Sequence, residues 1–350
     1  MTNQILYLSF SKLEYSVNAV YIKGLEQNGI EVHKRHLNKR RWGEYISVLK
    51  DYWKNRKSFE AIVVGYNSPE LVIWARLIFR QKIIYNALCS RYERFIVSRA
   101  VASRFSLKSF AYWLADFLAV HCANLVMLET NEQIKYFHQL FGVSKKKCYR
   151  AWTGVDEDKF FYDSQIQKPD VFTVIFRGGL LPESGAEYAV KVAKLLEKEN
   201  VKFIMHANDQ ELSKIQKLIE ELHLSNFKLM TEFLSDEELR NLMQRSHLSL
   251  GQLSNHARLA RTVPHKAFES LALRLPYLTA NNKGITELLK PGETCLVCNP
   301  ADPQSLAEQI IWAKNHSQEL ETIAEKGYRL YQEKLTAKVL VAELLKRMRN

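Results

Sequence analysis

The chain has 350 residues, 47% of them hydrophobic, a length that predicts two domains and a composition that excludes a disordered protein. Its five cysteines are scattered thinly, which excludes a disulfide framework and favours a reducing compartment. The formal net charge is +12, and most of it lies in residues 1–168, which carry 26 Lys and Arg against 15 Asp and Glu.

The first half alternates short apolar segments with helical ones, which is the pattern of a parallel sheet with crossover helices. The first strand follows the N-terminus directly, so we expect no signal peptide. The stretch 109–130 is nearly apolar, yet Asp116, His121 and Asn124 interrupt it, which favours a helix and a strand over a membrane span. Strands are predicted at 5–8, 31–33, 61–65, 82–85 and 124–129, and helices at 17–27, 70–79, 107–120 and 132–141.

Basic and aromatic residues are interleaved in two parts of the first half, residues 34–57 and 91–113. Such a surface suits an anionic membrane, an acidic or phosphate-bearing acceptor, or nucleic acid. A merely solvated face is a further explanation. No nucleic-acid motif accompanies the basic residues, so we favour the membrane surface and rank nucleic acid last.

A polar segment at 163–170 predicts the linker between the domains, after which the strand and helix pattern starts again. We expect an N-terminal domain at 1–168, joined by the C-terminal helix at 332–350, and a second domain at 169–331. In the second domain, strands are predicted at 171–176, 203–206, 227–230, 247–250 and 275–279, and helices at 187–199, 209–222, 235–244, from about 265, and between 305 and 349.

Two features of the second domain suit an anion. Gly178 and Gly179 follow its first strand, where backbone N–H groups can approach a phosphate closely. Pro264 suits the first turn of a helix, whose N-terminus carries free N–H groups and a positive dipole end. Lys266 and Glu269 share a face of that helix, so the lysine adds charge for a diphosphate and the glutamate can accept from hydroxyl groups. The alternative is an ordinary amphipathic helix with a solvated Lys266–Glu269 pair.

The segment around this helix resembles the nucleotide-sugar-binding segment of family 4 glycosyltransferases of the GT-B fold. The residues that match are Pro264, His265, Lys266, Phe268, Glu269, Ala272 and Pro276. Gly154, Val155, Asp156 and Phe160 resemble the turn that these enzymes carry before their interdomain linker.

The resemblance implies an α/β fold of two doubly wound Rossmann-like domains that face each other across a cleft. It implies a retaining hexosyltransferase whose donor substrate is a UDP- or GDP-sugar, with no cofactor and no metal. In such an enzyme, positively charged groups around the leaving diphosphate stabilise the transition state and supply much of the rate of sugar transfer. Cys295 and Cys298 have the spacing of half a zinc site, but neither a second pair nor a nearby histidine completes it.

The sequence departs from the family where two basic residues are usual in the glycine loop, because Gly179 and Ser184 occupy those positions. We expect Arg177, Lys266 and the pair Arg258 and Arg261 to compensate. Arg261 also stands where the family has its first glutamate, and Glu269 is expected to bind the ribose hydroxyls. The predicted donor-binding residues are Arg177, Gly178, Gly179, Ser184, Arg258, Arg261, His265, Lys266 and Glu269.

On the acceptor side, residues 86–93 follow a strand of the first domain and are expected to reach the cleft. Glu93 is a candidate for positioning or deprotonating an acceptor hydroxyl. The alternative for Glu93 is a surface ion pair with Arg91 or Arg94. The predicted catalytic residues are Glu93, Asn86 and Lys266.

Three functions follow from these features. The leading hypothesis is a cytoplasmic glycosyltransferase that works at the inner face of a membrane on a lipid-linked or polysaccharide acceptor. The second is a glycosyltransferase-like subunit that has lost turnover and acts as a binding or scaffolding partner, because Gly179 and Ser184 replace the basic pair. The third is a nucleic-acid-binding protein that uses the basic first half.

Overall fold

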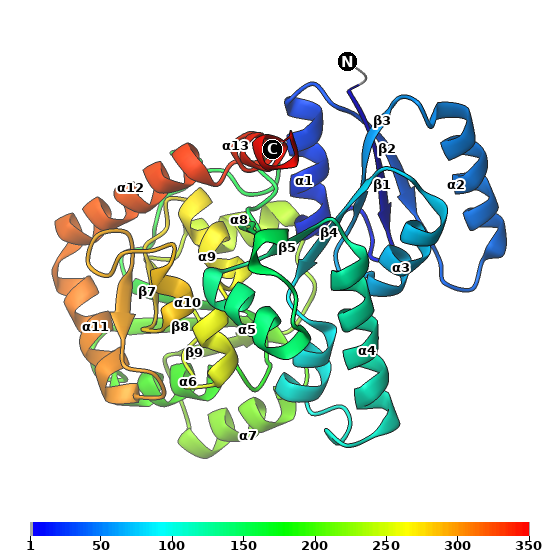
Figure 1. Cartoon of the computed structure of the whole chain (residues 1–350). Coiled ribbons are helices and arrows are strands. Elements are labelled where there is room, and N and C mark those ends of the chain that lie inside the picture. Colours follow the sequence, from blue (N-terminus) through cyan, green and yellow to red (C-terminus); the bar gives the residue numbers. More distant parts are fainter. Residues whose placement is uncertain (1–2, 350) are drawn as a thin grey trace. The chain divides into compact units, whose positions relative to one another are not determined.

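The computed structural model describes residues 3–349, which form two α/β units, each built on a parallel sheet (Figure 1). The first unit contains the chain up to Asp156 and again from Leu335 onward, and the second contains Glu157–Lys334. The chain therefore leaves the first unit once and returns to it at the C-terminus.

The sheet of the first unit has the strand order β2-β1-β3-β4-β5-β6, with all neighbours parallel. Its central strands are buried on both faces, as the apolar run Ile62-Val63-Val64 requires. The strands are β1 (Gln4–Ser9), β2 (Glu31–His36), β3 (Phe59–Val64), β4 (Lys82–Leu88), β5 (Leu125–Leu128) and β6 (Cys148–Arg150). The helices are α1 (Ser16–Gln27), α2 (Trp42–Asn55), α3 (Pro69–Ile78), α4 (Leu107–Cys122), α5 (Asn131–Phe141) and α13 (Ala337–Arg349), with a π-helix at Glu93–Ser98 and a 3₁₀ turn at Lys145–Lys147.

The C-terminal helix α13 packs beside α1 within the first unit (Figure 1). Gly24 makes this contact possible, because a Cβ there would lie 2.2 Å from the Ala337 oxygen and 2.4 Å from Val341 Cγ2. Val341 and Leu344 of α13 enter the same core as Ile5 and Tyr7 of β1. The first unit is therefore completed by the last residues of the chain.

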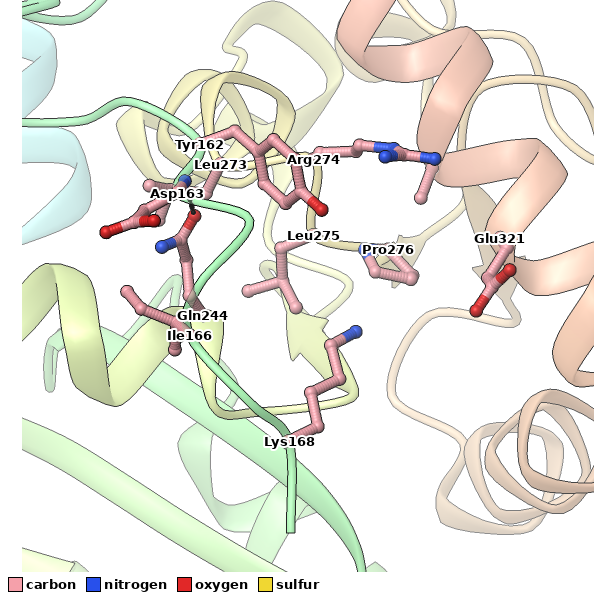
Figure 2. A pocket seen from close by; sticks show the side chains of 11 residues that line it. Tyr162, Asp163, Ile166, Lys168, Gln244, Leu273, Arg274, Leu275, Pro276 and Glu321 are labelled. Carbon is pink, nitrogen blue, oxygen red and sulfur yellow. Dashed lines mark hydrogen bonds between the residues drawn. The ribbon is translucent and has the colours of Figure 1, made fainter.

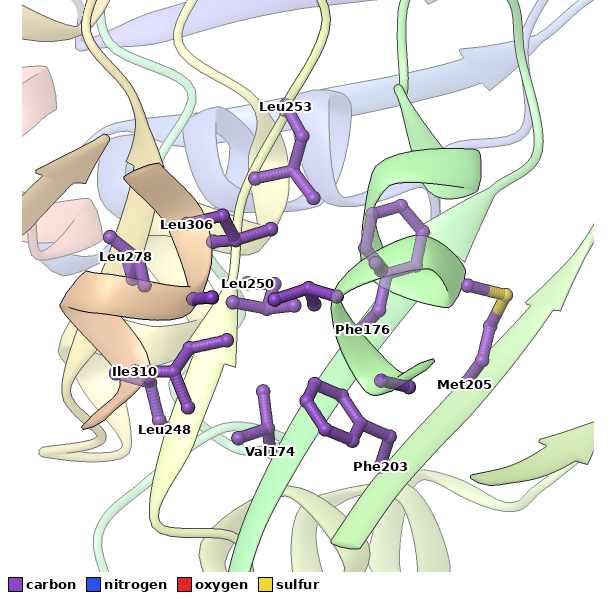
Figure 3. Close-up of a cluster of buried hydrophobic side chains, with 14 of the residues drawn as sticks. Val174, Phe176, Phe203, Met205, Leu248, Leu250, Leu253, Leu278, Leu306 and Ile310 are labelled. Atoms are coloured by element: carbon purple, nitrogen blue, oxygen red, sulfur yellow. The ribbon is translucent and has the colours of Figure 1, made fainter. Parts of the chain in front are cut away.

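The sheet of the second unit has the order β9-β8-β7-β10-β11-β12, again all parallel, which is the strand order of the Rossmann fold. Its core packs side chains of β7, β8, β10 and β11 against α11 (Figure 3). The strands are β7 (Phe172–Gly179), β8 (Val201–Asn208), β9 (Phe227–Met230), β10 (Leu248–Leu250), β11 (Tyr277–Ala280) and β12 (Leu296–Cys298). The helices are α6 (Ala186–Leu195), α7 (Leu212–Leu222), α8 (Asp236–Gln244), α9 (His265–Ala272), α10 (Lys283–Thr286), α11 (Pro303–Asn315) and α12 (Ser317–Lys334), with a 3₁₀ turn at Ala257–Arg261.

The expected α/β class with two Rossmann-like domains is thus confirmed, and the elements differ from their predicted bounds in a few places. The helix predicted from residue 209 begins at Leu212, because Asp209 has a φ of 141° that no helix allows. Residues 157–168, assigned to the first domain from sequence, group with the second unit, where the Asp163 N–H donates to Gln244 Oε1 at 2.9 Å. The first unit also begins its final segment at Leu335, three residues after the predicted start.

Among residues 3–349, no helix is both long enough and apolar enough to cross a membrane. The stretch 109–130 forms most of α4, then β5 and the two residues after it, as its polar interruptions predict.

Candidate functional site

The carboxyl end of β7 lies at the point where the strand order of the second sheet reverses, between β8 and β10. Ligands bind at such points in doubly wound sheets. Strand β7 ends in Arg177, Gly178 and Gly179, and Gly178 has a φ of 131°, which favours glycine. A Cβ on Gly178 would lie 3.4 Å from Lys266 Cε, so the missing side chain also leaves room for this lysine.

Helix α9 begins beside this turn. Pro264 is its N-cap residue, one position before the predicted first turn, and its φ of −63° matches the pyrrolidine ring. Every residue from Lys266 to Ala272 is buried, so α9 is a core helix rather than the amphipathic surface helix of the alternative explanation. Its N-terminal N–H groups and positive dipole end lie next to Lys266.

Glu269 forms a buried ion-pair network within the second unit. Both carboxylate oxygens accept from Arg177 Nη1, at 2.5 and 2.6 Å, and Oε1 is 2.9 Å from His265 Nδ1. Burial by itself raises the pKa of Glu269, but Arg177 and His265 outweigh it and lower the pKa to about 2. The carboxylate is therefore ionised, and the solvated Lys266–Glu269 pair of the alternative explanation is wrong, because Glu269 is buried and pairs with Arg177.

Lys266 is only 6% exposed, and among the described residues no carboxylate makes an ion pair with it. Its Nζ lies 3.4 Å from the Gly251 carbonyl oxygen and 3.7 Å from the centroid of the Phe176 ring. Burial and the nearby Arg177 lower the pKa of Lys266 to about 7, while Glu269 opposes the shift. Lys266 therefore lies at the N-terminus of α9 without an ion-pair partner among the described residues, and burial disfavours its charged form.

The other predicted donor residues are placed differently. Arg258 Nη1 lies 2.5 Å from Glu183 Oε1, so this buried carboxylate takes up its charge. Ser184 is buried and accepts from the Ala186 N–H at 3.3 Å, which makes it part of the turn before α6. Arg261 is partly buried at the end of the 3₁₀ turn. The compensation predicted for Arg258 stays a prediction, and in this structure Glu183 holds its guanidinium.

An open pocket of about 570 Å³ lies at the carboxyl ends of β7, β8 and β9. Of its lining residues, only those of β7 were predicted donor contacts. Residues 231–234 lie in the loop after β9 and carry no motif that marks them in the sequence. His265 Nε2, near this end of the sheet, is buried and has no hydrogen-bond partner among residues 3–349. The lining residues are Arg177, Gly178, Gly179, His206, Ala207, Asn208, Thr231, Glu232, Phe233, Leu234, Asp236 and Leu239.

A second pocket in the same unit, of about 320 Å³, lies at the other end of the sheet (Figure 2). Lys168 precedes β7, Gln244 precedes β10, and Pro276 precedes β11, so this pocket is at the amino ends of the strands. None of the predicted donor residues lines it.

The predicted acceptor residues lie in the first unit. Asn86 is buried in β4, and its Nδ2 donates to the Val17 oxygen at 3.4 Å. Glu93 has no exposed surface, and its Oε2 accepts from Gln133 Nε2 at 2.8 Å. The alternative surface ion pair is wrong, since Arg91 pairs with Glu70. The catalytic role predicted for Glu93 requires an accessible carboxylate, which this structure does not provide.

The structure thus brings Arg177, Gly178, Lys266, His265 and Glu269 together at one end of the second sheet, with Gly179 beside them. What unites them is a long-range pair, Arg177 with Glu269, whose members are 92 residues apart. This site can bind an anion through Lys266 and the α9 N-terminus, and a group with hydroxyls through Glu269. Among the described residues, no cluster of three or more His, Cys, Asp or Glu side chains could hold a metal ion.

The part of the chain that carries this site is similar to known proteins. Residues 158–330 match the family model described as Glycosyl transferases group 1. No curated protein sequence matches the chain.

Several solved structures are similar to the chain, at identities that show a common fold. Anabaena Alr3699/HepE in complex with UDP-glucose has a TM-score of 0.70 at 18% identity, covering 98% of this chain and 99% of that one. A sucrose-phosphate synthase from Thermosynechococcus elongatus has a TM-score of 0.75 at 13% identity, covering 99% and 98%. A glycosyltransferase from Rickettsia africae has a TM-score of 0.69 at 12% identity, with the same coverage. Residues 158–330, which contain the Lys266 site, therefore resemble a glycosyltransferase group 1 domain, and the whole chain shares the fold of these solved structures.

Proposed function

We propose that this chain transfers a sugar from a UDP- or GDP-sugar to a hydroxyl group of a lipid-linked or polysaccharide acceptor, as a retaining hexosyltransferase of family 4. The observation that carries the proposal is Lys266, a buried lysine at the N-terminus of α9 that forms no ion pair with a carboxylate between residues 3 and 349. Burying a lysine in this way is unfavourable unless a ligand supplies the opposite charge.

The leaving diphosphate gains negative charge as the glycosidic bond to the donor breaks. Lys266 Nζ, the α9 N-terminal N–H groups and the backbone at Gly178 are placed to meet that charge. Arg177 adds a second cation at the same end of the sheet, although Glu269 already neutralises part of it. These groups would balance the diphosphate without a metal ion.

The nucleoside is proposed to bind beside the diphosphate. Glu269 is ionised and can accept from ribose hydroxyls, and the 570 Å³ pocket offers space for a base between the loops after β8 and β9. Anabaena Alr3699/HepE is described in complex with UDP and with UDP-glucose, which makes uridine nucleotides the first to test.

The test is isothermal titration of the whole chain with UDP and GDP. We expect one of them to bind, and Lys266→Met to weaken binding at pH 7 by tenfold or more, because a charge-assisted contact contributes about 1.5–3 kcal/mol. Lys290→Met removes an exposed lysine of the same unit and should leave binding unchanged. If neither nucleotide binds at millimolar concentration, the proposal fails.

A second candidate is a glycosyltransferase-like subunit without turnover. Two observations favour this candidate. Gly179 and Ser184 supply no cation where the family usually has two, and Glu183 forms an ion pair with Arg258. An assay for donor hydrolysis and transfer distinguishes the two functions. Nucleotide binding without either reaction would support the binding or scaffolding role.

We also propose that the protein works in the cytoplasm at the inner face of a membrane. The first unit carries 28 Lys and Arg against 13 Asp and Glu, a balance of +15, so an anionic lipid surface would attract it. Cell fractionation with and without a high-salt wash tests this location.

A further inference from the structure

The loop before α4 and the outward face of that helix expose large apolar side chains. Phe105 is 99% exposed, Leu107 88% and Phe110 58%. Single exposed apolar residues are common on protein surfaces, but three within six residues form a contiguous patch.

The patch continues along α4 with helical spacing. Leu107, Phe110, Leu114 and Leu118 follow one another at intervals of three or four residues, so they lie on one face of the helix. Leu118 is 38% exposed, and Leu114 is partly exposed. The opposite face holds the buried residues of α4, including Ala119 and Val120, which enter the core of the first unit. Helix α4 is therefore apolar on both faces, although only one of them packs against its own unit.

The charges near this surface are positive. Arg104 and Lys108 flank Phe105 and Leu107, and neither makes an ion pair with any residue between 3 and 349. The only acidic residue of α4 is Asp116, which is buried and accepts from Ser90 Oγ at 2.7 Å. No acidic side chain of this helix therefore opposes the two cations.

We propose that Phe105 and the α4 face formed by Leu107, Phe110 and Leu118 dock on an anionic lipid bilayer. The apolar side chains enter the boundary between head groups and acyl chains, while Arg104 and Lys108 bind lipid phosphates. Apolar groups flanked by unpaired cations fit such a surface better than they fit a protein partner, whose apolar patch would leave both charges without a counterion.

The inference deepens the membrane partner proposed above by assigning residues to it, and it rests on that part of the proposed function alone. Vesicle binding needs neither donor nor acceptor, so the docking surface and the transfer reaction can fail separately.

The experiment is co-sedimentation of the whole chain with vesicles of phosphatidylglycerol and phosphatidylcholine, compared with phosphatidylcholine alone. We expect binding to the anionic vesicles and at least tenfold weaker partitioning for the double variant Phe105→Asp, Leu107→Asp. The double variant Arg104→Gln, Lys108→Gln should lose several-fold on anionic vesicles and change little on neutral ones. Trp42→Ala removes an equally prominent aromatic residue, 80% exposed on α2, and should bind like the unchanged protein.

Several results would overturn the assignment. One is that the unchanged chain fails to bind anionic vesicles at low salt. Another is that the Phe105 and Leu107 variant binds as well as the unchanged protein, or that Trp42→Ala weakens binding equally. A third is that light scattering finds a dimer which the Phe105 and Leu107 variant converts to a monomer, since a second copy would then cover this face. Nucleotide affinity should be the same in all these variants, because none of them lies in the second unit.

Discussion

Binding of a nucleoside diphosphate should take up a proton at Lys266. The pKa of this lysine is lowered to about 7 by burial and by Arg177, so at pH 8 only about a tenth of the side chains are charged in the empty site. A diphosphate beside Nζ favours the ammonium and raises that pKa toward its usual value of 10.5. The phosphate itself is already fully ionised at pH 8, since its last pKa is about 6.

The magnitude follows from these values. At pH 8 binding should take up close to ~0.9 proton per site, and at pH 7 roughly half a proton. The dissociation constant should accordingly rise by about tenfold from pH 8 to pH 9, which corresponds to ~1.4 kcal/mol. The sign is fixed, because a site that must gain a proton binds more weakly as the pH rises.

The assay is isothermal titration with UDP at pH 8 in two buffers of different ionisation enthalpy, Tris and HEPES. The difference in observed enthalpy gives the number of protons transferred. Lys266→Arg is the matched variant, because a guanidinium stays protonated at this pH and should bind without proton uptake. The reasoning is refuted if the unchanged protein binds UDP at pH 8 without taking up protons and with an affinity independent of pH between 7 and 9.

Three further predictions concern stability. Between pH 7 and 10.5 the unfolded chain binds more protons at Lys266 than the folded chain does, so this group makes the free energy of unfolding rise with pH. Replacing the buried lysine by an apolar residue removes this cost. We therefore expect Lys266→Met to raise the melting temperature of the ligand-free protein at pH 7 by ~2–4 °C or more. Burial raises the pKa of Asp116 from 3.8 to about 6, so the folded protein binds more protons between these pH values and loses stability as the pH rises through them. In urea unfolding, the free energy of unfolding of Asp116→Asn should increase relative to the unchanged protein by about 2–3 kcal/mol between pH 3.5 and pH 7. A difference that stays constant with pH would contradict this prediction. Gly24→Ala should lower the unfolding free energy by about 1–3 kcal/mol, because the new methyl group overlaps the Ala337 oxygen, whereas Gly43→Ala on α2 meets open space and serves as the control.

Local chemistry made much of the fold predictable. Ser235 and Glu238 form the capping box that starts α8, and Gly142 closes α5 in the left-handed conformation, as their sequence positions indicate. Lys266 and Glu269 were placed on one helix from Pro264 alone. In each case, the interactions that decide the structure lie within a few residues of one another.

The sequence could not predict which side chains become partners when segments far apart in the chain pack together. Arg177 meets Glu269 only because β7 lies beside β10 and α9 follows it, and no local pattern encodes that approach. The sequence suggested that Arg258 could add charge at the diphosphate, but it could not show that Glu183 forms an ion pair with Arg258 in the folded protein. Glu93 was expected to reach the cleft or, as the alternative, to form a surface ion pair, yet in the π-helix it is buried and accepts from Gln133.

The return of the chain to the first unit has a consequence for biosynthesis. Residues 335–349 are synthesised after the whole second unit, yet Val341, Leu344 and Leu345 fill the core beside Tyr7 and Leu25. The surface around Gly24 therefore stays uncovered while the whole second unit is synthesised. The second unit is one continuous segment, so it can fold during this time. A chain truncated shortly before Ala337 would thus contain the complete second unit but an incomplete first unit.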